Sequence, residues 1–164
     1  RYDLTGCMML VRIVRELTPE EVLQRIKRYE RELGMSFEEF EELFLRGKVE
    51  GGKAAAYFEW AGLVHAYRGY VEGGELDYMV EELHDFNAQQ MSLLTPKRIE
   101  LLYALASLRI ESISDLAKKL KRNVKNVYQD LQVLKKLGFV RFTRRGKRNI
   151  VPETLVEEIT FLIR

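Results

Sequence analysis

The sequence predicts a mainly α-helical protein with one small β-hairpin near its C-terminus. Two observations indicate this class. Apolar residues recur at spacings of three and four in several segments, most of which begin with a helix-capping residue. Residues 139–152 instead alternate on both sides of a glycine-containing turn, which is typical of a hairpin. With 164 residues, 46% of them apolar, the chain is long enough to build a real core.

The composition argues against a membrane-spanning or a secreted protein. No apolar run approaches the roughly 18 residues that a membrane span requires. The single cysteine, Cys7, cannot form an internal disulfide, and the first residues lack the pattern of a secretory signal, so we expect a cytoplasmic location. Residues 1–7 precede Met8 and Met9, and the sequence leaves open whether they belong to the fold.

The formal net charge of +2 hides an uneven division along the chain. Residues 1–90 contain 11 Lys/Arg and 18 Asp/Glu, whereas residues 91–164 contain 16 and 7. The two halves therefore carry −7 and +9. An acidic half joined to a basic half predicts two modules with different partners, and the basic module points first to nucleic acid.

The acidic half is predicted to form a helical module over residues 8–84. A short β-branched run at 9–14 precedes a helix expected over 18–34, with Thr18 as its N-cap and Glu21 closing a capping box. Further helices are expected from 36 onward and over 53–71. Aromatic residues are concentrated on the last of these helices. Core packing explains them, and so does an interface, because aromatic residues are enriched in interface centres. The residues are Tyr57, Phe58, Trp60, Tyr67 and Tyr70.

The acidic run at 38–42 raises the question of a metal site or a carboxylate-based nuclease. Its carboxylates are spread around a predicted helix, which favours a solvated face. His65 and His84 have no Cys or His neighbours at ligand spacing, and no phosphate-binding glycine motif is present. We therefore expect no enzyme, no catalytic residue, no cofactor and no metal.

The basic half follows the polar segment 85–94, which we interpret as a linker. A helix is predicted to begin at Thr95-Pro96. Its expected apolar face consists of Ile99, Leu102, Leu105 and Leu108. A second helix is expected after Ser112, and a tight turn at 121–123 leads to a third. The final segment, 154–164, fits either a helix or a strand.

The third helix of the basic half has two distinct faces. At about 100° per residue, one narrow sector, expected to face the other helices, contains Val124, Val127, Leu131 and Leu134. The opposite sector is polar and contains Lys125, Gln129, Gln132 and Lys136, with Asn126 and Tyr128 on its flanks. Asn and Gln can pair bidentately with adenine, and Lys can donate to guanine. This face is therefore the predicted base-reading surface.

The hairpin that follows has a cationic tip. Residues 118–148 contain 12 Lys/Arg and a single acidic residue, Asp130. Such a stretch would release several counterions on a phosphate backbone. We expect the tip residues to contact phosphates rather than to read bases. They are Arg144, Arg145, Lys147 and Arg148.

The order of helix, helix, tight turn, helix and basic hairpin resembles the winged helix-turn-helix domain of DNA-binding regulators, over roughly residues 93–153. The residues that carry the resemblance are Ile113-Ser114-Asp115-Leu116-Ala117, Lys125-Asn126-Val127 and Leu137-Gly138-Phe139-Val140. They are most similar to archaeal regulators of a MarR-like class, some of which resemble antitoxins of toxin–antitoxin pairs. The resemblance implies a third helix in the major groove and a wing on the adjacent backbone or minor groove.

One residue departs from that family. Arg122 stands in the turn where a small or apolar residue is usual, so it either adds a phosphate contact or loosens the turn.

Together these patterns predict a sequence-specific, double-stranded DNA-binding transcriptional regulator. Its DNA-binding domain is a winged helix-turn-helix at 95–153, and its N-terminal module is expected to form a homodimer or to hold a protein partner. The alternative is an antitoxin-like interaction module that neutralises a toxin-like partner and autoregulates through its winged helix. The predicted DNA-binding residues are Arg122, Lys125, Asn126, Tyr128, Gln129, Gln132, Arg144, Arg145, Lys147 and Arg148.

Overall fold

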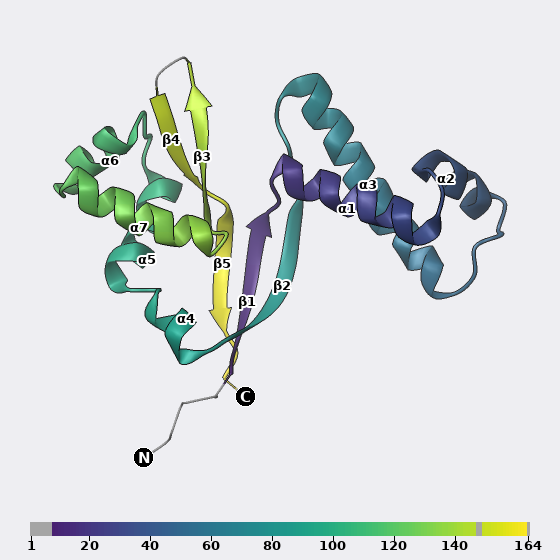
Figure 1. Cartoon of the computed structure of the whole chain (residues 1–164), viewed down its shortest axis with the longest axis horizontal. Helices are drawn as coiled ribbons and strands as arrows, with labels where there is room; N and C mark the ends of the chain where they lie inside the picture. Colours follow the sequence, from purple (N-terminus) through teal and green to yellow (C-terminus); the bar gives the residue numbers. More distant parts are fainter. Residues whose placement is uncertain (1–7, 147–148, 164) are drawn as a thin grey trace. The chain divides into compact units, whose positions relative to one another are not determined.

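The computed structural model describes residues 8–146 and 149–163 (Figure 1). The chain is mostly helical with two small sheets, one of them a C-terminal hairpin, so the predicted fold class is confirmed. Within the described residues no helix is both long and apolar enough to cross a membrane. In order, the elements are β1 (Met9–Glu16), α1 (Pro19–Leu33), α2 (Phe37–Leu45), α3 (Gly52–Gly73), β2 (Met79–Phe86), α4 (Ala88–Ser92), α5 (Pro96–Ser107), α6 (Ile113–Leu120), α7 (Val124–Lys136), β3 (Val140–Arg145), β4 (Asn149–Thr154) and β5 (Val156–Phe161).

The described chain divides into two compact units. One consists of residues 16–80, and the other combines the described residues before Glu16 with those from Glu81 onward. These limits differ from the predicted module boundary at residue 84. The segment 85–94, interpreted from the sequence as a linker, contains the end of β2 and the short helix α4. The predicted linker followed the polar composition of this segment, whereas the compact units follow strand pairing between distant segments.

That pairing builds a three-stranded sheet in the order β2-β1-β5. β1 runs antiparallel to β5, with Val11 opposite Phe161 and Ile13 opposite Ile159 (Figure 1). The predicted strand at 9–14 is confirmed, and the C-terminal segment takes the strand rather than the helix alternative. Val11 and Ile13 are buried in the same apolar cluster as the core residues of α5, α6 and α7.

The unit of residues 16–80 is built around Trp60 of α3, which is fully buried. The ring of Tyr29 from α1 stacks on it at 5.5 Å, and Phe37 of α2 meets it edge-on at 5.4 Å. Burial, together with a hydrogen bond to Glu59, raises the pKa of Tyr29 to about 12. The α1 start is the predicted capping box: Thr18 accepts from the Glu21 amide, and the Glu21 carboxylate accepts from the Thr18 amide.

The three helices α5, α6 and α7 share an apolar core. The α5 helix meets this core with part of its predicted face, because Leu102 and Leu105 pack against it and are partly buried. Leu101 and Ala104 are its buried residues, while Ile99 and Leu108 are 37% and 41% exposed. Leu108 has left the helix and has extended backbone angles, which takes it out of the helical sector. On α7 the predicted sector is buried from Val127 onward, but Val124, in the first turn, is 45% exposed.

Replacing Leu131 by Ala should reduce the free energy of unfolding by about 2–5 kcal/mol. This side chain is fully buried on α7, and its removal leaves a cavity among the three helices. Denaturant unfolding followed by circular dichroism measures the change. Ile163→Ala is the control, because Ile163 is 91% exposed and should change stability by no more than about 0.5 kcal/mol. Similar losses for both variants would contradict the assigned core.

Candidate nucleic-acid interface

The interface candidate begins with α6, whose start is held by local hydrogen bonds. The Ser112 hydroxyl accepts from the Asp115 amide at 3.0 Å, and the Asp115 carboxylate accepts from the Glu111 amide at 3.0 Å. The Glu111 amide and the ammonium group of Lys119 hold the pKa of Asp115 below its usual value. The predicted cap at Ser112 is therefore confirmed, and it sets where the short helix begins.

The turn between α6 and α7 is tight because three consecutive residues each supply one part of it. Lys121 adopts left-handed backbone angles (φ 54°, ψ 45°), which closes α6. The amide of Arg122 donates to the Ala117 carbonyl at 2.9 Å. Asn123 then caps α7, its side-chain oxygen accepting from the amide of Lys125 at 2.8 Å. This turn places the start of α7 directly after α6.

Arg122 is held inside this unit by an acidic residue of α7. Its guanidinium donates to Asp130 at 2.6 Å, and the guanidinium of Arg98 from α5 donates to the other Asp130 oxygen at 3.1 Å. All three side chains are largely buried. Arg98 also donates to the Leu93 carbonyl. Arg122 therefore ties the turn to α7, and the interface proposed below does not include it.

The opposite side of α7 presents the predicted base-reading residues to solvent. Lys125, Asn126 and Gln129 are all exposed, and Gln132 is half-buried. Their exposure follows from the burial of Val127, Leu131 and Leu134 on the far side of the same helix. One cationic donor and two side-chain amides, each with a donor and an acceptor, are thus exposed near the start of α7.

Tyr128 lies at the edge of this face and packs on the hairpin. Its ring stacks on Phe142 of β3 with a centroid distance of 6.4 Å and an interplanar angle of 19°. The Lys135 ammonium lies 5.3 Å from the centre of the Phe142 ring. Tyr128 keeps about half of its surface exposed, and its ring packing joins α7 to the hairpin.

The hairpin itself is regular, with Val140 opposite Thr154 and Arg145 opposite Asn149. Arg144 is exposed and has no ion-pair partner within residues 8–146 and 149–163. Arg145 lies 3.8 Å from Glu153, which is held more closely by Arg141 at 3.0 Å. Lys147 and Arg148, both predicted phosphate contacts, lie outside the described residues.

Two further cations of this region were not singled out by the sequence. Lys118 and Lys121 are exposed at the end of α6 and in the turn, next to the start of α7. Their position in the basic stretch was visible, but only the structure shows that both are exposed. Asp130 was also noted only as an isolated acid. Its contacts show that it holds the side chains of Arg98 and Arg122.

The acidic unit contains no comparable gathering of metal ligands. Three of the four carboxylates of the run at 38–42 have separate partners: Glu38 binds Arg68 at 2.8 Å, Glu41 the Tyr57 hydroxyl at 2.8 Å, and Glu42 Arg46 at 2.6 Å. Across the part of the chain that the structure describes, no group of three or more His, Cys, Asp or Glu could hold a metal ion. Of the aromatic residues on α3, Trp60 belongs to the core and Phe58 is 67% exposed.

Comparison with known proteins points to the same part of the chain. Residues 93–160 match the model of the family described as HVO_A0114. The C-terminal helices and hairpin are similar to this haloarchaeal family. The match runs from the end of α4 through α5, α6, α7 and the hairpin into β5, which is less than half of the chain. Searches among curated proteins and among solved structures find no match.

A double-mutant cycle on Arg122→Ala and Asp130→Ala should show a favourable coupling of about 0.5–3 kcal/mol in the free energy of unfolding. The two groups form a short, largely buried ion pair. Asp130→Ala leaves Arg122 without its carboxylate, whereas Arg122→Ala leaves Asp130 with Arg98 as its remaining partner. Lys125→Ala removes the same charge from an exposed position and should change stability by no more than about 0.5 kcal/mol. A coupling near zero would return Arg122 to the list of candidate DNA contacts.

Lys121→Gly should stabilise the protein by about 0.5–1 kcal/mol, because glycine adopts the left-handed conformation of this residue without steric cost. Thermal or denaturant unfolding measures the gain. Lys118→Gly removes an equal charge from helical backbone in α6 and should instead destabilise by about 0.5–1 kcal/mol. A loss of stability in both variants would contradict the role assigned to the turn.

Proposed function

We propose that the C-terminal helices and hairpin form a winged helix-turn-helix that binds double-stranded DNA sequence-specifically. The observation that carries this proposal is the exposed face of α7, where Lys125, Asn126 and Gln129 stand together beside a cationic hairpin. An α-helix fits the major groove of B-DNA, where each base pair presents a distinct pattern of donors and acceptors. The family match over residues 93–160 coincides with these elements.

Base reading is assigned to the first two turns of α7. The side-chain amides of Asn126 and Gln129 each carry a donor and an acceptor, so either can pair bidentately with adenine. The ammonium group of Lys125 can donate to the two acceptors of guanine. The packing of Tyr128 on Phe142 fixes the hairpin against α7, so the reading face and the wing approach DNA as one body.

Phosphate contacts are assigned to the cations around this face. Arg144 of the hairpin and Lys118 and Lys121 beside the turn are exposed, and such groups position a protein on DNA without reading sequence. Arg122 and Arg141 have carboxylate partners at short distance, so fewer cations than the basic composition suggests are available to phosphates.

We further propose that the protein is a transcriptional regulator of the MarR-like winged-helix class and that it acts by occupying its site on DNA. Such domains commonly bind as twofold dimers to paired half-sites. The unit of residues 16–80 is the proposed partner-binding part. Phe58 is the most exposed of the Phe, Tyr and Trp side chains in this unit.

Sequence selection from a random duplex library, followed by titration of the selected and a scrambled duplex, tests the assignment. Lys125→Ala and Gln129→Ala should each reduce discrimination between the two duplexes by about 1–3 kcal/mol, because each removes a base contact. Arg144→Ala should weaken binding to both duplexes alike and lower the salt slope by about 0.9.

Two outcomes would count against this proposal. The absence of measurable duplex affinity at low salt would contradict DNA binding altogether. Equal losses on both duplexes for Lys125→Ala and Gln129→Ala would contradict base reading by α7. Lys97→Ala is the matched control, because Lys97 is exposed on α5, outside the predicted base-reading surface, and should leave discrimination unchanged.

A further inference from the structure

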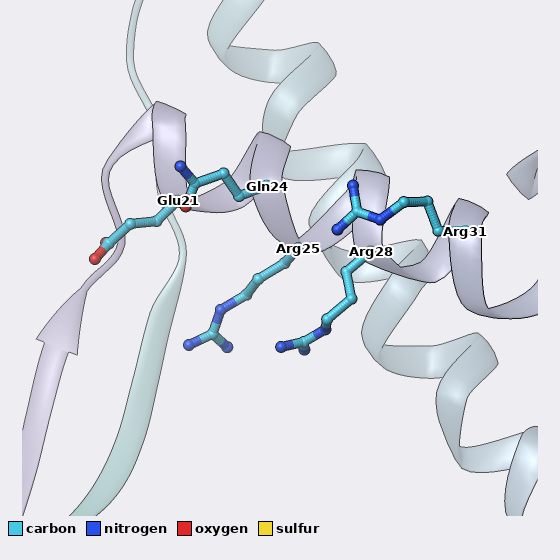
Figure 2. A pocket seen from close by; sticks show the side chains of 5 residues that line it. All are labelled: Glu21, Gln24, Arg25, Arg28 and Arg31. Atoms are coloured by element: carbon cyan, nitrogen blue, oxygen red, sulfur yellow. The ribbon is translucent and has the colours of Figure 1, made fainter.

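A second cationic surface lies on α1, in the unit of residues 16–80. An open groove of about 400 Å³ runs along this helix and is lined by Glu21, Gln24, Arg25, Arg28 and Arg31 (Figure 2). In this view the side chains of Arg25 and Arg28 extend from the helix in the same direction, and that of Arg31 lies along the helix. We call this surface the α1 arginine groove.

The arginines stand out because the unit around them is acidic. Residues 16–80 contain 8 Lys/Arg and 14 Asp/Glu. The other two arginines of the unit are tightly paired, Arg46 with Glu42 at 2.6 Å and Arg68 with Glu38 at 2.8 Å. Three of its five arginines are nevertheless gathered on one helix face.

Two of these arginines are weakly compensated. Arg28 lies 3.9 Å from Glu32, at the limit of an ion pair between exposed groups, and Arg31 has no ion-pair partner in the described part of the chain. The two are three residues apart, so their like charges are neighbours and repel each other. An anion bound between them would remove this repulsion.

The lining restricts the kind of anion that fits. All five residues are polar, so a peptide or an apolar ligand would bury little apolar surface in the groove. A guanidinium presents a planar fork of donors that matches phosphate oxygens bidentately. Arg25, Arg28 and Arg31 are spaced along about 9 Å of helix axis, which suits several linked phosphate groups better than a single one.

We infer that the α1 arginine groove binds an oligophosphate anion, with Arg28 and Arg31 as its principal donors and Arg25 and Gln24 at its side. The oligophosphate is a free chain such as that of a nucleoside triphosphate, or a run of nucleic-acid phosphates. This inference is independent of DNA reading by α7, because none of its residues belongs to that face.

Isothermal titration of the full chain with sodium triphosphate, at low and constant ionic strength, tests the inference. Triphosphate should bind, orthophosphate should bind at least about tenfold more weakly, and Arg28→Ala/Arg31→Ala should weaken triphosphate binding at least about tenfold. Lys27→Ala is the control: Lys27 is exposed on the same helix outside the groove, so binding should change less than about twofold. Arg28→Lys/Arg31→Lys keeps the charge but loses the planar guanidinium donors, so it should also bind triphosphate more weakly than the native chain.

Two further titrations distinguish the sources of phosphate. ATP binding tighter than that of triphosphate indicates a nucleotide. Competition by a short duplex against triphosphate, kept in Lys125→Ala, indicates a nucleic-acid backbone; both results support the groove. No triphosphate binding, or equal losses for Lys27→Ala and Arg28→Ala/Arg31→Ala, would overturn it. Thermal unfolding in plain buffer checks that all variants are folded, and triphosphate should raise the midpoint of the native chain but not of Arg28→Ala/Arg31→Ala.

Discussion

The burial of one sector of α7 is the constraint on which the rest of the C-terminal unit depends. Val127, Leu131 and Leu134 have to leave water, and α5 and α6 supply the apolar surface that covers them. Because α7 is a rigid helix, burying this sector turns Lys125 and Gln129 outward. Core packing therefore orients the polar face of α7, and the polar side chains need no contacts of their own to keep that orientation.

Ion pairs then determine which cationic side chains of the C-terminal unit remain available to an anionic ligand. Asp130 is a lone acid in a basic stretch, and it binds the guanidinium groups of both Arg98 and Arg122. Glu153 does the same for Arg141 on the hairpin. Total charge therefore overstates the cations available to an anionic ligand, because part of it neutralises carboxylates inside the unit. In the unit of residues 16–80 the net charge is misleading in the opposite sense. This charge is negative, yet Arg28 and Arg31 lie together on α1.

Much of the architecture could be predicted because its causes are local. The capping box at Thr18, the cap at Ser112 and the hairpin around Gly146 depend on residues only a few positions apart. The exposure of Lys125, Asn126 and Gln129 could also be predicted, since helical periodicity alone sets them opposite the apolar sector of α7. The face of α5 was less predictable, because its register depends on which neighbouring elements cover it.

By itself, then, the sequence determined the mainly helical class, the positions of most helices and the side chains on the polar face of α7. Tertiary structure alone decided the pairing of β1 with β5, which joins Ile13 to Ile159 across the whole chain. It also decided that Arg122 contacts Asp130 and that Tyr128 stacks on Phe142. The physical reason is the same in each case: these contacts join segments whose proximity is set by the closure of the fold, and neither local propensity nor periodicity carries information about that closure.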